Sequence, residues 1–96
     1  MKLVVSASSK KDKKLVARFY EGSKVVKTTH FGARGMSDYT IHKDKKRRSL
    51  YRGRHKKDLN TKDPTRAGYL SYYILWGEDT NLKKAIASYK KKFKYS

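Results

Sequence analysis

The stretch His42–Lys57 is the densest set of chemically useful side chains in the chain. It reads HKDKKRRSLYRGRHKK and holds nine Lys or Arg, two His and a single acid, Asp44. Arg makes bidentate contacts with phosphate and Lys acts as a point charge, so the mixture is typical of a phosphate-binding surface. Because like charges at this density repel one another, we expect a polyanion to neutralise them.

A helix over about 39–57 would present these cations on two of its faces. Tyr51 could donate a hydrogen bond to phosphate or stack on a base. The predicted nucleic-acid contacts in this helix are Lys43, Lys45, Lys46, Arg47, Arg48, Tyr51, Arg52, Arg54, His55, Lys56 and Lys57. The alternative is a solvated charged face, which we disfavour because ordinary soluble surfaces mix charges of both signs.

A second cationic cluster lies near the end of the chain. Its lysines either form a second contact surface that lets the protein bridge two polyanion segments, or they keep an amphipathic helix soluble. The two interpretations carry similar weight. The members predicted to contact nucleic acid are Lys90, Lys91 and Lys92.

Patterns for catalysis or metal binding are weak. The three His are not at a metal-binding spacing, Cys is absent, and the acids are too scattered for a two-metal centre. His-Lys-Asp at 42–44 suggests a nuclease or phospholipase D, but that signature spaces the three residues apart, and adjacent helical residues point in different directions. A simpler role for Asp44 is to orient Arg47 or Arg48. We therefore expect no catalytic residue, no metal and no cofactor.

Length and composition indicate one small basic domain. The chain has 96 residues and carries 26 Lys and Arg against eight Asp and Glu, for a net charge of +18. This balance favours nucleic acid first and anionic lipid second as the partner. The absence of Cys favours a reducing compartment. There is no apolar run long enough for a transmembrane helix, and the stretch Met1–Ser9 is too short for a signal peptide.

The element pattern predicts an α+β fold, with a small three-stranded antiparallel sheet followed by three helices. Residues 1–31 are β-branched segments separated by a polar loop at 8–14 and a turn at 21–23, which is typical of a β-meander. Residues 32–38 form a glycine loop, and residues 39–96 form the helical part. Ser37, Asp38 or Thr40 would cap the first helix.

Two further helices complete the predicted helical part. Asp63 and Pro64 form a strong helix start signal, and Gly77 stands at the expected C′ position of that helix. We expect Leu70, Ile74 and Trp76 in the core, while the tyrosines of this helix are either core or a stacking platform for single strands. The last helix, capped by Asp79 or Thr80, has the most regular apolar period: Leu82, Ala85, Ile86, Tyr89 and Phe93.

From Phe31 to Phe93 the chain carries a long pattern, FG..G..DYT.HKD..RR..Y..RH followed by DP..AG.LS.Y.LWG and a helix ending KKF. This pattern resembles a family of short basic proteins encoded by large double-stranded DNA viruses of eukaryotes. The family has no established activity to carry over, and residues 1–30 look like its variable region. The matching residues are Phe31, Gly32, Gly35, Asp38, Tyr39, Thr40, His42, Lys43, Asp44, Arg47, Arg48, Tyr51, Arg54, His55, Ala67, Gly68, Leu70, Ser71, Leu75 and Trp76.

The resemblance implies a viral origin, and with the charge pattern it gives our functional hypothesis. We predict a non-enzymatic virion protein that binds DNA, most readily double-stranded DNA, through its phosphates and without base specificity. It would act in genome binding or packaging, inside the host cell during assembly and then in the virion. The alternative is a minor capsid protein on the inner face of the capsid, where it would contact acidic protein surfaces or membrane headgroups. A small nuclease ranks last.

Overall fold

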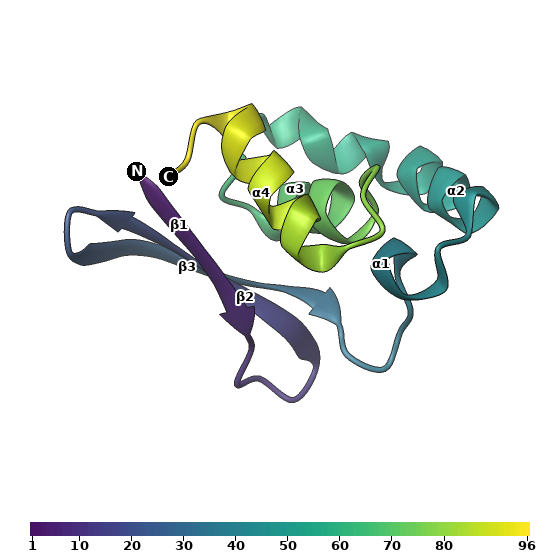
Figure 1. The fold of residues 1–96 in the computed structure, drawn as a ribbon, viewed down its shortest axis with the longest axis horizontal. Helices are drawn as coiled ribbons and strands as arrows, with labels where there is room; N and C mark the ends of the chain where they lie inside the picture. The colour runs from purple at the N-terminus through teal and green to yellow at the C-terminus, as the bar shows by residue number, and fades with distance from the viewer.

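The first third of the chain forms a three-stranded antiparallel sheet in the computed structural model, which describes residues 1–96 (Figure 1). Its strands β1 (Lys2–Ala7), β2 (Lys13–Glu21) and β3 (Lys24–Ala33) lie in the order of the sequence. The predicted meander is therefore confirmed. The loop between β1 and β2 is shorter than expected, and β3 runs two residues past the predicted end of the sheet.

The core lies between one face of this sheet and the helices, with α3 (Ala67–Leu70) and α4 (Leu82–Phe93) above the strands (Figure 1). The period-2 alternation of the strands puts their apolar side chains on this face. The buried cluster consists of Leu3, Ala17, Phe19, Phe31, Leu70, Ile74, Leu75, Ala85 and Tyr89. The core positions predicted for Leu70 and Ile74 are confirmed, whereas Trp76 is only partly buried at the margin.

The predicted continuous helix over 39–57 is wrong. The structure has a short helix α1 (Tyr39–His42), a separate helix α2 (Lys45–His55) and a 3-10 helix η1 (Lys56–Thr61). The break lies at Asp44, whose carboxylate accepts hydrogen bonds from the amides of Lys46 and Arg47 at 2.9 and 3.3 Å. A residue that caps a helix this way must leave the helical conformation. Asp44 therefore starts a helix and does not orient an Arg side chain.

The central helix also begins later than predicted. The Asp63 carboxylate accepts bonds from the amide and hydroxyl of Thr65, which makes a turn, and α3 starts only at Ala67. It continues as the π-helical segment η2 (Ser71–Leu75). The last helix is capped by Asn81, which accepts from the Lys84 amide, and not by the predicted Asp79 or Thr80. Its predicted apolar face is confirmed.

Three helices end in a left-handed residue, and each of these residues is a lysine. Lys43 ends α1, Lys62 ends η1 and Lys94 ends α4, with φ between 54° and 59°. Glycine usually occupies this position because a Cβ is strained there. A cation at a helix C-terminus compensates in part, because it faces the negative end of the helix dipole.

Gly77 is required at its position for a different reason from the one predicted. Its φ is not positive, so it is not a left-handed C′ residue. A Cβ built on Gly77 would lie 2.1 Å from the Tyr73 carbonyl oxygen, so the glycine permits a close approach of two backbone segments. None of the helices has the length and apolar content needed to cross a membrane.

We predict opposite effects of alanine at two helical-region glycines. Gly77→Ala forces a backbone shift and should lower the free energy of unfolding by about 1–3 kcal/mol. Gly53→Ala lies in α2 with open space around its Cβ, and it should raise that free energy by about 0.5–1 kcal/mol. Urea denaturation followed by circular dichroism measures both. Equal effects of the two substitutions would contradict the close approach at Gly77.

Candidate nucleic-acid interface

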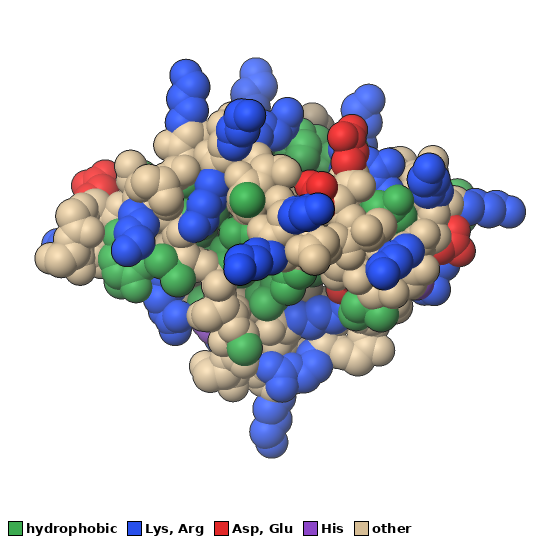
Figure 2. All heavy atoms as spheres, viewed as in Figure 1, with side chains coloured by type: hydrophobic (Ala, Val, Ile, Leu, Met, Phe, Trp, Pro, Cys, Tyr) green, Lys and Arg blue, Asp and Glu red, His purple; other side chains and the backbone are tan.

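Positive charge on this molecule has almost no internal compensation. Of the 26 Lys and Arg, only Lys14 and Arg66 have a carboxylate oxygen within 4.0 Å, on Asp38 and Asp63. Figure 2 shows Lys and Arg side chains spread over this face and projecting at its top, right and bottom edges, with few acidic groups among them. Neutralisation must therefore come from outside the chain.

Two of the predicted phosphate contacts, Arg48 and Arg52, instead face the interior. The Arg48 Nε donates to the Gly77 carbonyl at 2.6 Å, and an Arg52 Nη donates to the Trp76 and Tyr72 carbonyls at 2.8 and 3.2 Å. These carbonyls belong to the C-terminal end of the central helix and have no partner within the helix. The guanidinium of Arg52 also lies 3.9 Å from the centre of the Tyr72 ring. Both arginines therefore dock α2 onto the core and are not free for phosphate.

Tyr51 is likewise held inside the fold. Its ring stacks on Trp76 with centroids 4.2 Å apart and planes 7° apart, and on its other side lies His55 at 4.1 Å. Both faces of the ring are occupied, so the predicted stacking of Tyr51 on a base is wrong for this structure. Burial raises the pKa of its hydroxyl above the ordinary value, so the group keeps its proton as a hydrogen-bond donor.

The remaining predicted cations of this stretch are exposed. They fall in α1–α2 and at the start of η1, and they are Lys43, Lys45, Lys46, Arg47, Arg54, Lys56 and Lys57. Lys91 and Lys92 in α4 are exposed too, and Lys90 is half-buried. The C-terminal end of α4 lies at the opposite end of the helical layer from α2 (Figure 1). The two predicted clusters are thus separate surfaces.

A cleft of about 670 Å³ lies between the end of the sheet and α2. Its floor includes the apolar side chains of Phe31, Leu75 and Trp76. Cations from both sides surround it: Lys13 and Lys14 from β2, and Arg47 and Arg54 from α2. The cleft therefore combines an apolar floor with a cationic rim.

A second depression, of about 720 Å³, continues from this cleft along β3. The two share Lys13, Asp58, Ala67 and Gly68, so we treat them as one feature, the basic groove. The second half is polar and adds further cations: Lys10, Lys27 and Arg66. Sequence reasoning missed these residues and the β2 lysines of the cleft, because they come from segments that only the tertiary fold brings beside α2.

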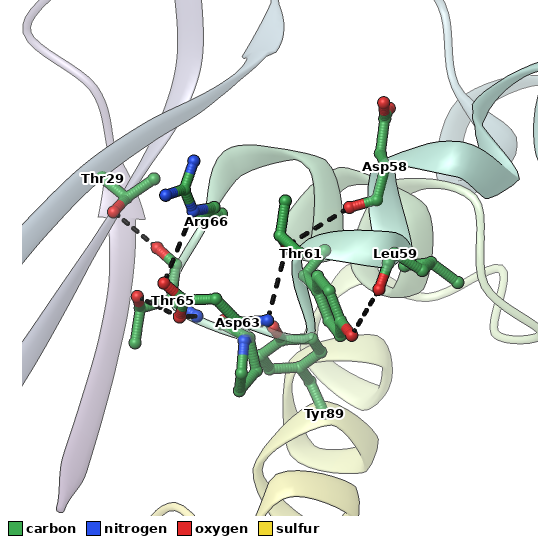
Figure 3. Close-up of polar contacts among 10 residues, drawn as sticks. Thr29, Asp58, Leu59, Thr61, Asp63, Thr65, Arg66 and Tyr89 are labelled. Atoms are coloured by element: carbon green, nitrogen blue, oxygen red, sulfur yellow. Dashed lines mark hydrogen bonds and ion pairs between the residues drawn. The ribbon is translucent and has the colours of Figure 1, made fainter.

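One wall of the basic groove, the segment 58–66, is fastened to both layers of the fold (Figure 3). The Thr29 hydroxyl in β3 donates to the Thr65 carbonyl at 2.7 Å, and the Tyr89 hydroxyl in α4 donates to the Pro64 carbonyl. Hydrogen bonds from Thr65 hold the pKa of Asp63 below its ordinary value. A wall held at several points presents its side chains in a fixed arrangement.

The opposite wall is fixed by a buried ion pair. The Lys14 ammonium lies 2.6 Å from the Asp38 carboxylate, which is 2% exposed. The same carboxylate caps α1 by accepting from the Thr40 amide at 2.9 Å. Breaking one partner of a buried pair leaves an uncompensated charge, so this contact holds the glycine loop against the sheet. Asp38 is the cap that the sequence proposed among three candidates.

The histidines and acids do not form a metal centre, since no group of three or more such side chains is placed to hold an ion. The His42 Nδ1 accepts from the Asp44 amide at 2.9 Å, and the His55 Nδ1 lies 3.1 Å from the Asp58 carboxylate. Both histidines therefore have local partners within the fold.

Comparison with known proteins gives a family match. Residues 3–55 fit the model of a family of unknown function, DUF5754. The matched region runs from β1 to the end of α2, so it includes the sheet, which looked variable from sequence, together with the basic helix. No curated protein and no solved structure matches the chain.

Arg52 and Arg47 should differ sharply in their effect on stability. Arg52→Ala removes charged hydrogen bonds to two helix-end carbonyls, and we expect a loss of about 2–3 kcal/mol in the free energy of unfolding. Arg47→Ala changes an exposed side chain and should stay within about 0.5 kcal/mol of the wild type. Chemical denaturation of the two variants tests the assignment. A loss of similar size in both would show that Arg52 does not dock α2.

Asp63 should make part of the free energy of unfolding depend on pH in the acidic range. Its pKa is lower in the folded chain than in the unfolded chain, so the carboxylate stabilises the fold above the unfolded value. That contribution is lost as the pH falls through about 4 towards the folded pKa. Asp63→Asn should therefore lose less stability than the wild type between about pH 6 and pH 3, measured by urea denaturation. Parallel curves for the two proteins would rule out this role.

Proposed function

Since the chain belongs to the family of unknown function DUF5754, whose name states no activity, we propose from the site itself that the protein binds DNA through phosphate contacts. The observation that carries this proposal is the uncompensated charge beside a preformed groove. Seven exposed cations lie on α1–α2 and η1, and two of them, Arg47 and Arg54, line a groove whose other sides add lysines and an arginine from the sheet and from the segment 58–66. Cations clustered in this way can neutralise successive phosphates along a nucleic-acid backbone.

The proposed binding does not depend on base sequence. Direct readout of bases often uses Asn or Gln, but the chain contains no Gln and only two Asn, at 60 and 81, neither of which lines the basic groove. Arg47 and Arg54 are exposed and serve phosphate as readily as base edges. Contacts to phosphate position a protein on DNA without carrying sequence information.

The proposed protein is not an enzyme. Hydrolysis of a phosphodiester needs an activated nucleophile or metal ions beside the phosphate. The histidines that line the groove, His30 and His55, are engaged with the Ser8 hydroxyl and the Asp58 carboxylate, and no carboxylate cluster accompanies them. Binding alone accounts for the arrangement of charges.

The resemblance to basic proteins of large DNA viruses makes a packaged genome the DNA that we propose as the natural partner. In this role a protein of net charge +18 would neutralise phosphates throughout a condensed genome. The alternative is a protein that lines the inner face of a capsid and uses the same cations on acidic partners. Affinity for DNA at physiological salt separates the two.

We predict that duplex binding depends steeply on salt and that four exposed cations of α2, of which Arg47 and Arg54 line the basic groove, carry much of this dependence. In the test variant, Lys45, Lys46, Arg47 and Arg54 are all changed to Gln, and the docking arginines Arg48 and Arg52 are left intact. Each lost phosphate contact should lower the slope of log K against log salt by about 0.9. Anisotropy titrations of a labelled blunt duplex at several salt concentrations measure the slope.

A matched control removes the same charge from elsewhere on the surface. Lys2, Lys24, Lys83 and Lys84 are exposed and do not line the basic groove, and all four are changed to Gln. This variant should keep most of the wild-type slope. Equal slopes for the two variants would mean that net charge alone is responsible, and weak binding of wild type at physiological salt would favour the capsid alternative.

A further inference from the structure

The cleft at the α2 end of the basic groove differs chemically from the rest of the groove. Its floor is apolar, and two large apolar side chains at its mouth, Met36 and Leu50, are 67% and 58% exposed. A surface that contacts only the DNA backbone gains nothing from exposed apolar side chains, because phosphate and sugar are polar. Exposed apolar side chains gathered in a cleft indicate a ligand with an apolar part.

The polar groups of the cleft indicate the rest of that ligand. Lys13, Arg47 and Arg54 have no carboxylate partner and can meet a negative charge at the rim, whereas Lys14 is held by Asp38. The lining also includes Ser71 and Asp58, and the Asp58 carboxylate lies 3.1 Å from the His55 Nδ1. These groups suit a molecule with a flat body, hydrogen-bonding edges and an attached phosphate.

We propose that this cleft takes one unpaired nucleotide of the bound DNA, with the base inside and the flanking phosphates on the cationic rim. The inference rests on the proposed DNA binding and specifies which form of DNA the site prefers. A paired base keeps its faces inside the duplex stack, so only a base in a single strand, an overhang or a frayed end can enter. The volume of the cleft, about 670 Å³, lies within the usual range for ligand pockets.

The base would not stack on the ring faces of Tyr51 or Trp76. Both faces of Tyr51 are covered, and the indole of Trp76 lies between Tyr51 and His42, whose ring centre is 5.2 Å away. The accessible groups are the edges of these rings and the aliphatic side chains of Met36 and Leu50. The base is therefore held by apolar packing and by hydrogen bonds at its edge.

A lipid acyl chain fits the same cleft less well. It would cover the Ser71 and Asp58 side chains of the lining with apolar groups, and removing water from the Asp58 carboxylate is costly even though His55 is its partner. A nucleobase carries donors and acceptors along its edge and avoids that cost. Anionic vesicles are nevertheless included in the test, because the cationic rim alone would attract them.

The experiment compares a blunt duplex with the same duplex carrying a short single-stranded overhang, at one salt concentration. Wild type should bind the overhang duplex about 5- to 100-fold more tightly, the range expected for holding one base. Met36→Ser combined with Leu50→Ser should remove most of this preference and leave blunt-duplex affinity unchanged. The matched control combines Val26→Ser with Ile41→Ser, which are similarly exposed, 44% and 62%, but do not line the cleft, and should keep the preference.

Three results would overturn the inference, and they differ in what they say about DNA binding. Equal affinity of wild type for both duplexes removes the nucleotide site but leaves the proposed function standing. Equal loss of preference in both double variants shows that the preference does not arise in the cleft. If wild type binds neither DNA but binds anionic vesicles, and the cleft variant weakens that binding, then the proposed function also fails.

Discussion

The docking of Arg48 and Arg52 onto the end of the central helix is the contact on which the helical layer depends. The last carbonyls of a helix carry partial negative charge and lack partners, so guanidinium groups satisfy them both electrically and by hydrogen bonding. This contact lets a strongly basic helix pack against a core. It also brings Tyr51 against Trp76, which closes one side of the cleft.

Elements whose signals are local were the ones that the sequence predicted well. The meander follows from β-branched segments and short turns, and α4 follows from a regular apolar period. The prediction for residues 39–57 was wrong because the thin apolar stripe of this region could not show whether the chain stays helical past Lys43. Asp44 decided the outcome through a cap, and an Asp in a run of cations looks equally like an ion-pair partner.

Only the net positive charge of the candidate site could be predicted from the sequence. The excess of Lys and Arg indicates a polyanion partner, and most of the cations named between Lys43 and Lys57 are indeed exposed. Which arginines turn inward depends on carbonyls 20 or more positions away in sequence, at Tyr72, Trp76 and Gly77. The cleft is hidden from sequence for the same reason, because its walls are the end of the sheet, α2 and the turn into α3.

The lysines that end α1, η1 and α4 in a left-handed conformation have a consequence for how the fold is maintained. Glycine at Lys43, Lys62 or Lys94 would relieve about 1 kcal/mol of strain at each position, and it would also remove a positive charge. The backbone therefore carries strain at these three positions, and the lysine side chains there add to the charge repulsion within the molecule. Binding of an anion to the native state raises the free energy of unfolding by mass action. The proposed DNA partner would therefore act as a component of the folded structure as well as its ligand.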